Sequence, residues 1–133
     1  MIFHSRMGYE RTKKEAHNIY KKIDAIPCPV FNGELIYFNS RGFNHLIRKG
    51  RKSRTKNEQK KRFRLIVYAE RMIRYPDQRL KIEYQERNSF KNSIKFWTLV
   101  ENIDGILVKL VIGQEYGKRK EFISIMRRDK RFK

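Results

Sequence analysis

The apolar residues of this chain follow two different periods, and the change between them constrains the fold more than any other feature of the sequence. Up to about residue 74 they recur at helical spacing, whereas from about residue 79 they alternate with polar residues as in β-strands. The sequence therefore predicts the α+β class, with helices packed on one face of a sheet. We expect a single domain over residues 1–133, with an N-terminal helix over 5–24, a helical part over 39–74 and a sheet over 79–127.

Turn and breaker residues divide the first 40 residues. Pro27 ends the N-terminal helix, because proline cannot continue a helical hydrogen-bond ladder. Asn32-Gly33 is the preferred pair for a two-residue hairpin turn. We therefore expect a small hairpin over 30–38.

Capping residues mark two further helices. Ser40 is expected to cap a short helix over 41–49, which Gly50 ends. The segment Thr55–Glu58 fits a capping box, which predicts a longer helix over 56–74.

The second half is predicted to form a four-stranded antiparallel β-meander. Asp104-Gly105 is a second strong signal for a tight hairpin. Each strand offers one apolar face, as expected when helices cover only one side of an antiparallel sheet. The inward residues of the first three strands are expected to be Leu80, Ile82 and Tyr84, then Ile94, Phe96, Thr98 and Val100, then Ile106, Val108, Leu110 and Ile112. The open face is expected to carry Lys95, Trp97, Glu101, Lys109, Phe122, Ser124 and Met126.

The charge of the chain predicts a polyanionic partner. It has 33 Lys and Arg against 14 Asp and Glu, a formal net charge of +19 at pH 7. Between Arg48 and Arg64 there are ten basic residues and a single acid, Glu58. RNA, DNA and an anionic membrane surface fit this density. No apolar run is long enough to cross a bilayer, and the helices are expected to pack on a core, so a membrane is the least favoured of the three. The lone Cys28 excludes a disulfide within the chain and favours a reducing, cytoplasmic location.

His45 lies among these cations, on the side of the predicted helix 41–49 that is opposite its apolar residues. Two interpretations are open. The first is a solvated histidine on the surface of a basic helix. The second is a general base or acid for phosphodiester cleavage, since nearby cations lower the pKa of an imidazole and favour its neutral form.

Arginine and serine side chains extend this hypothesis. Arg48, Arg51 and Arg54 are candidates for fixed phosphate contacts, because a guanidinium can bind two phosphate oxygens at once. Ser124 is either a tolerated polar residue of the last strand or a hydroxyl that donates to a phosphate oxygen. Trp97 and Phe122 are candidates for stacking on nucleobases, with ordinary packing as the alternative.

Other kinds of site are not indicated. One cysteine and three scattered histidines give no zinc-ligand spacing, and the sequence has no P-loop, dinucleotide-binding glycines or G-x-S-x-G elbow. No cluster of acids of the kind that seats magnesium is present, so we expect neither a metal nor another cofactor. Metal-independent cleavage needs the RNA 2′-hydroxyl as an internal nucleophile, which favours RNA over DNA and predicts a 2′,3′-cyclic phosphate.

Four segments resemble the phage-associated group of the barnase–EndoU–colicin–RelE (BECR) nuclease superfamily. They begin with Tyr37-Phe-Asn-Ser-Arg-Gly-Phe-Asn-His-Leu-Ile-Arg-Lys-Gly-Arg and cover roughly residues 29–127 in the right order. The other three are Lys-Asn-Glu-Gln-Lys-Lys-Arg-Phe (56–63), Lys95-Phe-Trp-Thr-Leu-Val and Glu121-Phe-Ile-Ser-Ile-Met.

The resemblance implies a helical N-terminal part packed on a four-stranded antiparallel sheet, and a metal-free endoribonuclease that often acts as a toxin or phage-encoded effector. The implied catalytic residues are His45, Arg48, Lys49 and Ser124. Several members of the superfamily use a second histidine on the sheet, and this chain has none there. The general acid is therefore left open between a lysine, an arginine and His45 itself.

The sequence thus supports an endoribonuclease, with a non-catalytic basic RNA- or DNA-binding protein as the alternative. A strongly basic toxin is expected to have an acidic inhibitor protein as a partner. The RNA target and the oligomeric state are not indicated. In both cases the residues expected to bind nucleic acid are Arg41, Arg51, Arg54, Lys95, Trp97, Lys109, Lys120 and Phe122.

Overall fold

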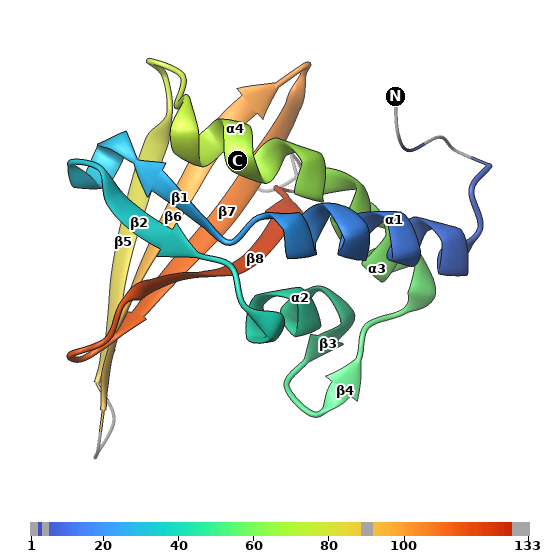
Figure 1. The fold of residues 1–133 in the computed structure, drawn as a ribbon, viewed down its shortest axis with the longest axis horizontal. Helices are drawn as coiled ribbons and strands as arrows, with labels where there is room; N and C mark the ends of the chain where they lie inside the picture. Colours follow the sequence, from blue (N-terminus) through green and yellow to red (C-terminus); the bar gives the residue numbers. More distant parts are fainter. Residues whose placement is uncertain (1–2, 4–5, 89–91, 129–133) are drawn as a thin grey trace.

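The computed structural model describes residues 3, 6–88 and 92–128, and these form helices packed on a mostly antiparallel sheet (Figure 1). The α+β class predicted from the sequence is confirmed. The helices are α1 (Tyr9–Lys22), α2 (Ser40–Ile47), α3 (Lys56–Leu65) and α4 (Ala69–Arg74), with 3₁₀ turns η1 (Pro29–Phe31) and η2 (Ile66–Tyr68). The strands are β1 (Ala25–Cys28), β2 (Glu34–Tyr37), β3 (Arg48–Lys49), β4 (Lys52–Ser53), β5 (Lys81–Asn88), β6 (Ser93–Ile103), β7 (Ile106–Glu115) and β8 (Lys120–Arg127).

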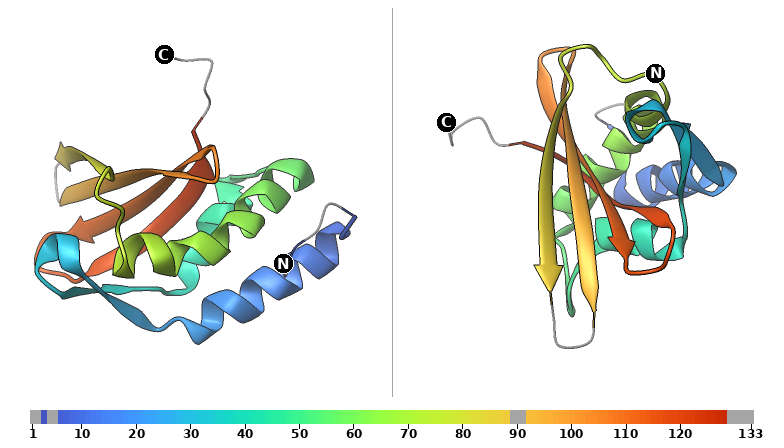
Figure 2. Two further views of the ribbon diagram at one scale, coloured as in Figure 1. Left: turned by 90° about the horizontal axis from the view of Figure 1, so that it is seen from above. Right: turned by 90° about the vertical axis from the view of Figure 1, so that its left-hand side faces the viewer.

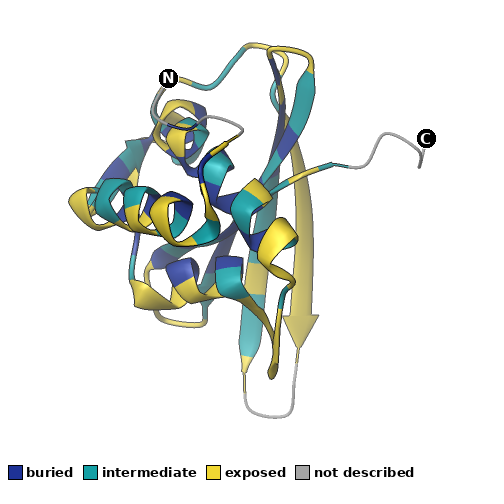
Figure 3. Cartoon of the chain, turned by 90° about the vertical axis from the view of Figure 1, so that its right-hand side faces the viewer, coloured by how far each residue is buried: buried dark blue, intermediate teal, exposed yellow. Residues whose placement is uncertain are grey.

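In the part of the chain that the structure describes, the main sheet has six strands in the order β1-β2-β8-β7-β6-β5. Strands β5 to β8 follow one another as antiparallel neighbours. β2 joins β8 in parallel, but only through Ile36 and Tyr37. Figure 2 shows α1, α3 and α4 on one side of the curved sheet, and Figure 3 shows that the helix surfaces turned toward it are the buried ones.

The N-terminal hairpin begins earlier than predicted. β1 pairs with β2 from Ala25 to Cys28, and the segment around Val30 forms the 3₁₀ turn η1 instead of a strand. Pro27 is compatible with β1 because β1 is the edge strand, where a missing N–H breaks no ladder. Asn32 has the left-handed conformation that the predicted turn needs.

The helix α2 differs at both ends from the predicted 41–49. Asn39, rather than Ser40, is the N-cap, and its side-chain oxygen accepts hydrogen bonds from the backbone N–H groups of Arg41 and Gly42. The helix ends at Ile47, and Gly50 adopts φ 63° in the turn of the small β3–β4 hairpin that follows. Gly50 therefore has the left-handed conformation expected of a glycine that ends a helix, but it lies in a hairpin turn and not at the end of α2.

The predicted helix 56–74 is present as three consecutive pieces. Thr55 is the N-cap of α3 and its hydroxyl accepts from the N–H of Glu58, as the capping box predicts. The 3₁₀ turn η2 then separates α3 from α4.

The core lies between the helices and one face of the sheet. In β7, Val108, Leu110 and Ile112 are fully buried there, as predicted. In β6 the predicted faces are reversed: Leu99 and Ile103 point into the core, because Leu99 pairs with Leu110. The residues predicted to face inward, Ile94, Phe96, Thr98 and Val100, alternate with this set and lie on the other face.

Candidate functional site

His45 lies on the exposed side of α2, which packs along β8. Gly42 makes this position possible, because a Cβ atom there would lie 2.7 Å from the backbone oxygen of Phe122. The hydroxyl of Tyr20 also donates to the carbonyl oxygen of Asn39, the N-cap of α2. The packing of α2 on β8 and Tyr20 therefore determines the position from which His45 faces solvent.

The pKa of His45 is lowered from its ordinary value. Partial desolvation of the ring is the main cause, followed by the positive charges of Arg54 and Arg41. Both effects disfavour the imidazolium ion. The lowered pKa favours the neutral imidazole, which is the form that can accept a proton.

A short basic hairpin, residues 48–54, follows α2 directly. The N–H of Arg54 donates to the carbonyl oxygen of Ile47 at 2.8 Å, and the Arg54 Nε donates to the carbonyl oxygen of His45 at 3.0 Å. Arg48 donates from Nη2 to the carbonyl oxygen of Arg51 at 2.6 Å. These contacts close the hairpin and hold the Arg54 guanidinium beside the helix that carries His45.

The cations of the basic hairpin form no ion pair within the described part of the chain, although the charge of Glu58 acts on Arg54. Every residue from 48 to 53 is exposed, and Arg54 is half-buried. The ion pairs of the structure involve other basic residues. The charges of Arg48, Lys49, Arg51, Lys52 and Arg54 are therefore available to an external anion.

Ser124 does not face solvent as the predicted open face requires. It is buried, and its hydroxyl accepts from Nη1 of Arg62 in α3 at 2.9 Å. The Nε of Arg62 donates to Glu58 at 2.7 Å, and the charge of Arg62 in turn lowers the pKa of Arg54 after desolvation. Ser124 and His45 are thus not placed face to face: Ser124 contacts Arg62, whereas Arg54 contacts the backbone of His45.

Ser124 points toward the helices, like Phe122 two residues before it, and both side chains are buried. The sequence had placed these two residues on the open face of the sheet, whereas this part of β8 turns that face to the core. The register of β8 against β7 then shifts between Val111 and Ile112, so β8 contains a β-bulge and Ile125 is buried as well.

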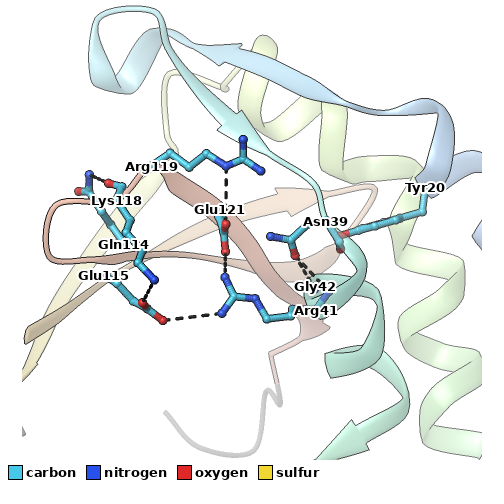
Figure 4. A network of polar contacts seen from close by, with 9 residues as sticks. All are labelled: Tyr20, Asn39, Arg41, Gly42, Gln114, Glu115, Lys118, Arg119 and Glu121. Carbon is cyan, nitrogen blue, oxygen red and sulfur yellow. Dashed lines mark hydrogen bonds and ion pairs between the residues drawn. The ribbon is translucent and has the colours of Figure 1, made fainter. Parts of the chain in front are cut away.

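Arg41 is held by acids of the sheet (Figure 4). Its guanidinium lies 2.6 Å from Glu121 and 3.7 Å from Glu115, and Arg119 lies 3.7 Å from the other oxygen of Glu121. Arg41 is thus close to His45 but less available to an external anion than the hairpin cations.

The predicted sheet residues divide between the core and the surface. Phe122 is fully buried and stacks on Phe38 at 4.8 Å, so it cannot stack on a nucleobase. Lys120 is also buried, where it pairs with Glu34 at 2.7 Å. Its ammonium lies 4.9 Å from the ring of Trp97. These positions correct the prediction that Lys120 and Phe122 lie on an open surface.

Trp97 and Lys95 share the helix-facing side of β6, beyond the region that the helices bury. Trp97 is half-buried and has Phe31 at 5.1 Å, whereas Lys95 is exposed. Lys109 and Met126 pair on the other face of the sheet. Glu101 lies on the core face and accepts from the N–H of Asp77, so the predicted open face is in fact divided between the two sides of the sheet.

Sequence reasoning missed Arg62 and Glu121. Arg62 lies four residues after Glu58, a spacing that favours an ion pair on a helix, and this signal was available. The contact between Arg41 and Glu121 joins residues 80 positions apart, and no local pattern indicates it.

Within the described residues, no group of three or more His, Cys, Asp and Glu side chains is placed to hold a metal ion. Over the same part of the chain, no helix has the length and hydrophobicity of a membrane span. Comparisons with models of known families, with curated proteins and with solved structures found no match.

Proposed function

We propose that this chain is a metal-independent endoribonuclease with His45 as its general base. The observation that carries the proposal is an exposed imidazole with a lowered pKa beside a hairpin of cations that form no ion pairs in the described residues. We also propose that the chain belongs to the phage-associated group of the BECR superfamily, with strands β5 to β8 as its antiparallel meander. An exposed imidazole supports base catalysis, and unpaired cations support phosphate binding.

The proposed reaction uses the RNA itself as nucleophile. His45 takes the proton of a 2′-hydroxyl, the O2′–P bond forms and the P–O5′ bond breaks. The products are a 2′,3′-cyclic phosphate and a 5′-hydroxyl, and no metal-activated water is required. Arg54 and Arg48 stabilise the charge that develops on the phosphorane oxygens, and Lys49 donates the proton to the leaving O5′.

Ser124 has a structural role in this proposal. Its hydroxyl holds Arg62, whose charge acts on Arg54 beside His45. Arg62 and Ser124 are therefore positioning residues, and neither contacts the substrate. A toxin or phage effector with an acidic inhibitor protein is the biological setting that we propose for a chain of net charge +19.

The test is cleavage of RNA in the presence of EDTA. Purified wild-type protein is expected to produce fragments with 2′,3′-cyclic phosphate and 5′-hydroxyl ends, and His45→Ala is expected to produce none. His17→Gln is the matched control, because His17 is also exposed but lies on α1. Intact RNA at high excess of wild-type protein would refute the proposal, and so would equal cleavage by His45→Ala.

The second candidate is a non-catalytic RNA- or DNA-binding protein. The burial of Ser124 against Arg62 favours it, because this removes a hydroxyl that the nuclease hypothesis had placed at the phosphate. The same unpaired cations suffice for binding. In that case His45→Ala leaves both the affinity for RNA and its salt dependence unchanged, and wild-type protein cuts nothing.

A further inference from the structure

A hollow of about 210 Å³ lies where β6 and β7 meet the turn before β8. Its frame is rigid, because the N–H of Tyr116 donates to the carbonyl oxygen of Ser93 and the N–H of Lys118 donates to that of Glu115, both at 3.0 Å. Gly117 has φ 74° in this turn. The hollow is lined by Ser93, Lys95, Gln114, Glu115, Tyr116 and Gly117.

The lining combines a free aromatic ring with polar groups. Tyr116 is 87% exposed, the largest exposure of the large apolar and aromatic side chains in the described residues. The amide nitrogen of Gln114 donates to the carbonyl oxygen of Lys118 at 2.7 Å, and its amide oxygen accepts no side-chain or backbone hydrogen bond within the described residues. Lys95 is exposed and lies opposite Glu86 of β5, whose pKa its charge helps to lower, but it forms no ion pair in the described part of the chain.

The hollow adjoins the proposed catalytic centre through a pair of charges. Glu115 lines the hollow and pairs with Arg41 at 3.7 Å (Figure 4). Arg41 lies one helical turn before His45 and contributes to its lowered pKa. A strand that reaches His45 therefore passes close to the hollow.

We propose that this hollow is a subsite for one nucleobase of a single-stranded RNA. The Tyr116 ring stacks on the base, the Gln114 amide oxygen accepts a hydrogen bond from its edge, and Lys95 contacts a flanking phosphate. The hollow is smaller than the 300–1,000 Å³ typical of pockets for drug-sized ligands, and this size suits a single base. The assignment rests on the proposed function, because it places the base on the same strand that His45 cleaves.

The subsite is tested by binding in the full chain with His45→Ala, so that no cleavage occurs. Fluorescence anisotropy measures affinity for short oligoribonucleotides in which one position at a time lacks its base. We expect one abasic position to weaken binding about tenfold, the factor that corresponds to about 1.4 kcal/mol. Tyr116→Ala weakens binding of the intact oligoribonucleotide by a similar factor and removes the effect of the abasic position.

Tyr75→Ala is the matched control, because Tyr75 is 71% exposed and lies after α4. Tyr116→Ala must also leave the salt dependence of binding unchanged, since no charge is lost. Equal effects of Tyr116→Ala and Tyr75→Ala would overturn the subsite. So would an abasic effect that persists in Tyr116→Ala, or complete displacement of the oligoribonucleotide by a free nucleoside monophosphate.

Failure of the subsite is distinct from failure of the nuclease. Cleavage by wild-type protein without any dependence on Tyr116 overturns the subsite and leaves the nuclease in place. Coupling between Tyr116 and one base, in a protein that does not cleave RNA, supports base recognition and overturns the nuclease.

Discussion

Two arginines from different elements act on the imidazole of His45. Arg41 lies on the same helix, and Arg54 comes from the end of the basic hairpin. The charge of Arg54 lies near the imidazole because its Nε donates a hydrogen bond to the carbonyl oxygen of His45 at 3.0 Å. The lowered pKa of His45 thus depends in part on a charge that the hairpin brings into place.

Replacing Arg54 is expected to shift the pH dependence of cleavage. In Arg54→Gln the lost charge lets the pKa of His45 rise toward ~6.5. Since the base is active when neutral, kcat/KM of wild type reaches its plateau at a lower pH than that of the variant. NMR titration of the His45 ring measures the same shift directly.

The matched control for this shift is Arg54→Lys, which keeps the charge and loses the guanidinium. The pKa of His45 should stay low in Arg54→Lys. Equal titration curves for Arg54→Gln and Arg54→Lys would show that the charge of Arg54 does not act on His45.

Ser124 is expected to affect stability more than catalysis. In Ser124→Ala the buried Nη1 of Arg62 loses its acceptor, which should lower the free energy of unfolding by about 1–3 kcal/mol. Urea denaturation measures the loss, and Ser53→Ala on the exposed β4 should change stability by less than about 0.5 kcal/mol. Lost cleavage at unchanged stability would instead place Ser124 at the phosphate.

The close packing of the helix α2 on β8 depends on a single glycine, Gly42. A Cβ at Gly42 would lie 2.7 Å from the backbone oxygen of Phe122 and would also contact the hydroxyl of Tyr20. Neither β8 nor the buried tyrosine can move without disturbing the core. The closeness of α2 and β8 is therefore built on this glycine.

Gly42→Ala is expected to destabilise the protein although alanine is the better helix former. Overpacking costs about 1–3 kcal/mol and outweighs the gain of up to about 1 kcal/mol in helix propensity. Urea denaturation measures the difference, with Gly8→Ala as the control because a Cβ at Gly8 meets nothing within 4 Å. A stabilised Gly42→Ala would mean that α2 does not pack on β8 as described.

Local signals in the sequence predicted the elements that local chemistry controls. The N-cap at Thr55 and the turn at Asp104-Gly105 are both present, the latter with φ 52° and 82°. Contacts between distant segments were not predictable in this way. The face of β8 that carries Phe122 and Ser124 is buried because α2 and α3 pack on it, and the parallel pairing of β2 with β8 depends on segments far apart in sequence.

Across the whole molecule, as far as the structure describes it, the acidic residues form ion pairs with some basic residues and leave others unpaired. Carboxylates pair with basic residues of α2, α3, α4 and the sheet, whereas the basic hairpin forms no ion pair within the described residues. In the proposed function, the net charge of +19 attracts the RNA and the basic hairpin is the place where its phosphates bind.

This unevenness predicts which cations contribute to the salt dependence of RNA binding. For single strands, log K falls against log salt with a slope of about −0.7 for each phosphate neutralised. The double substitution Lys49→Gln and Lys52→Gln is therefore expected to reduce the slope by about 1.4 when both lysines contact phosphates. Lys14→Gln with Lys21→Gln removes the same charge from exposed positions on α1 and should leave the slope nearly unchanged. Anisotropy titrations between about 50 and 200 mM salt measure the slopes of the two double variants. Equal reductions would mean that RNA is attracted by net charge alone, and the basic hairpin would then have no special part in binding.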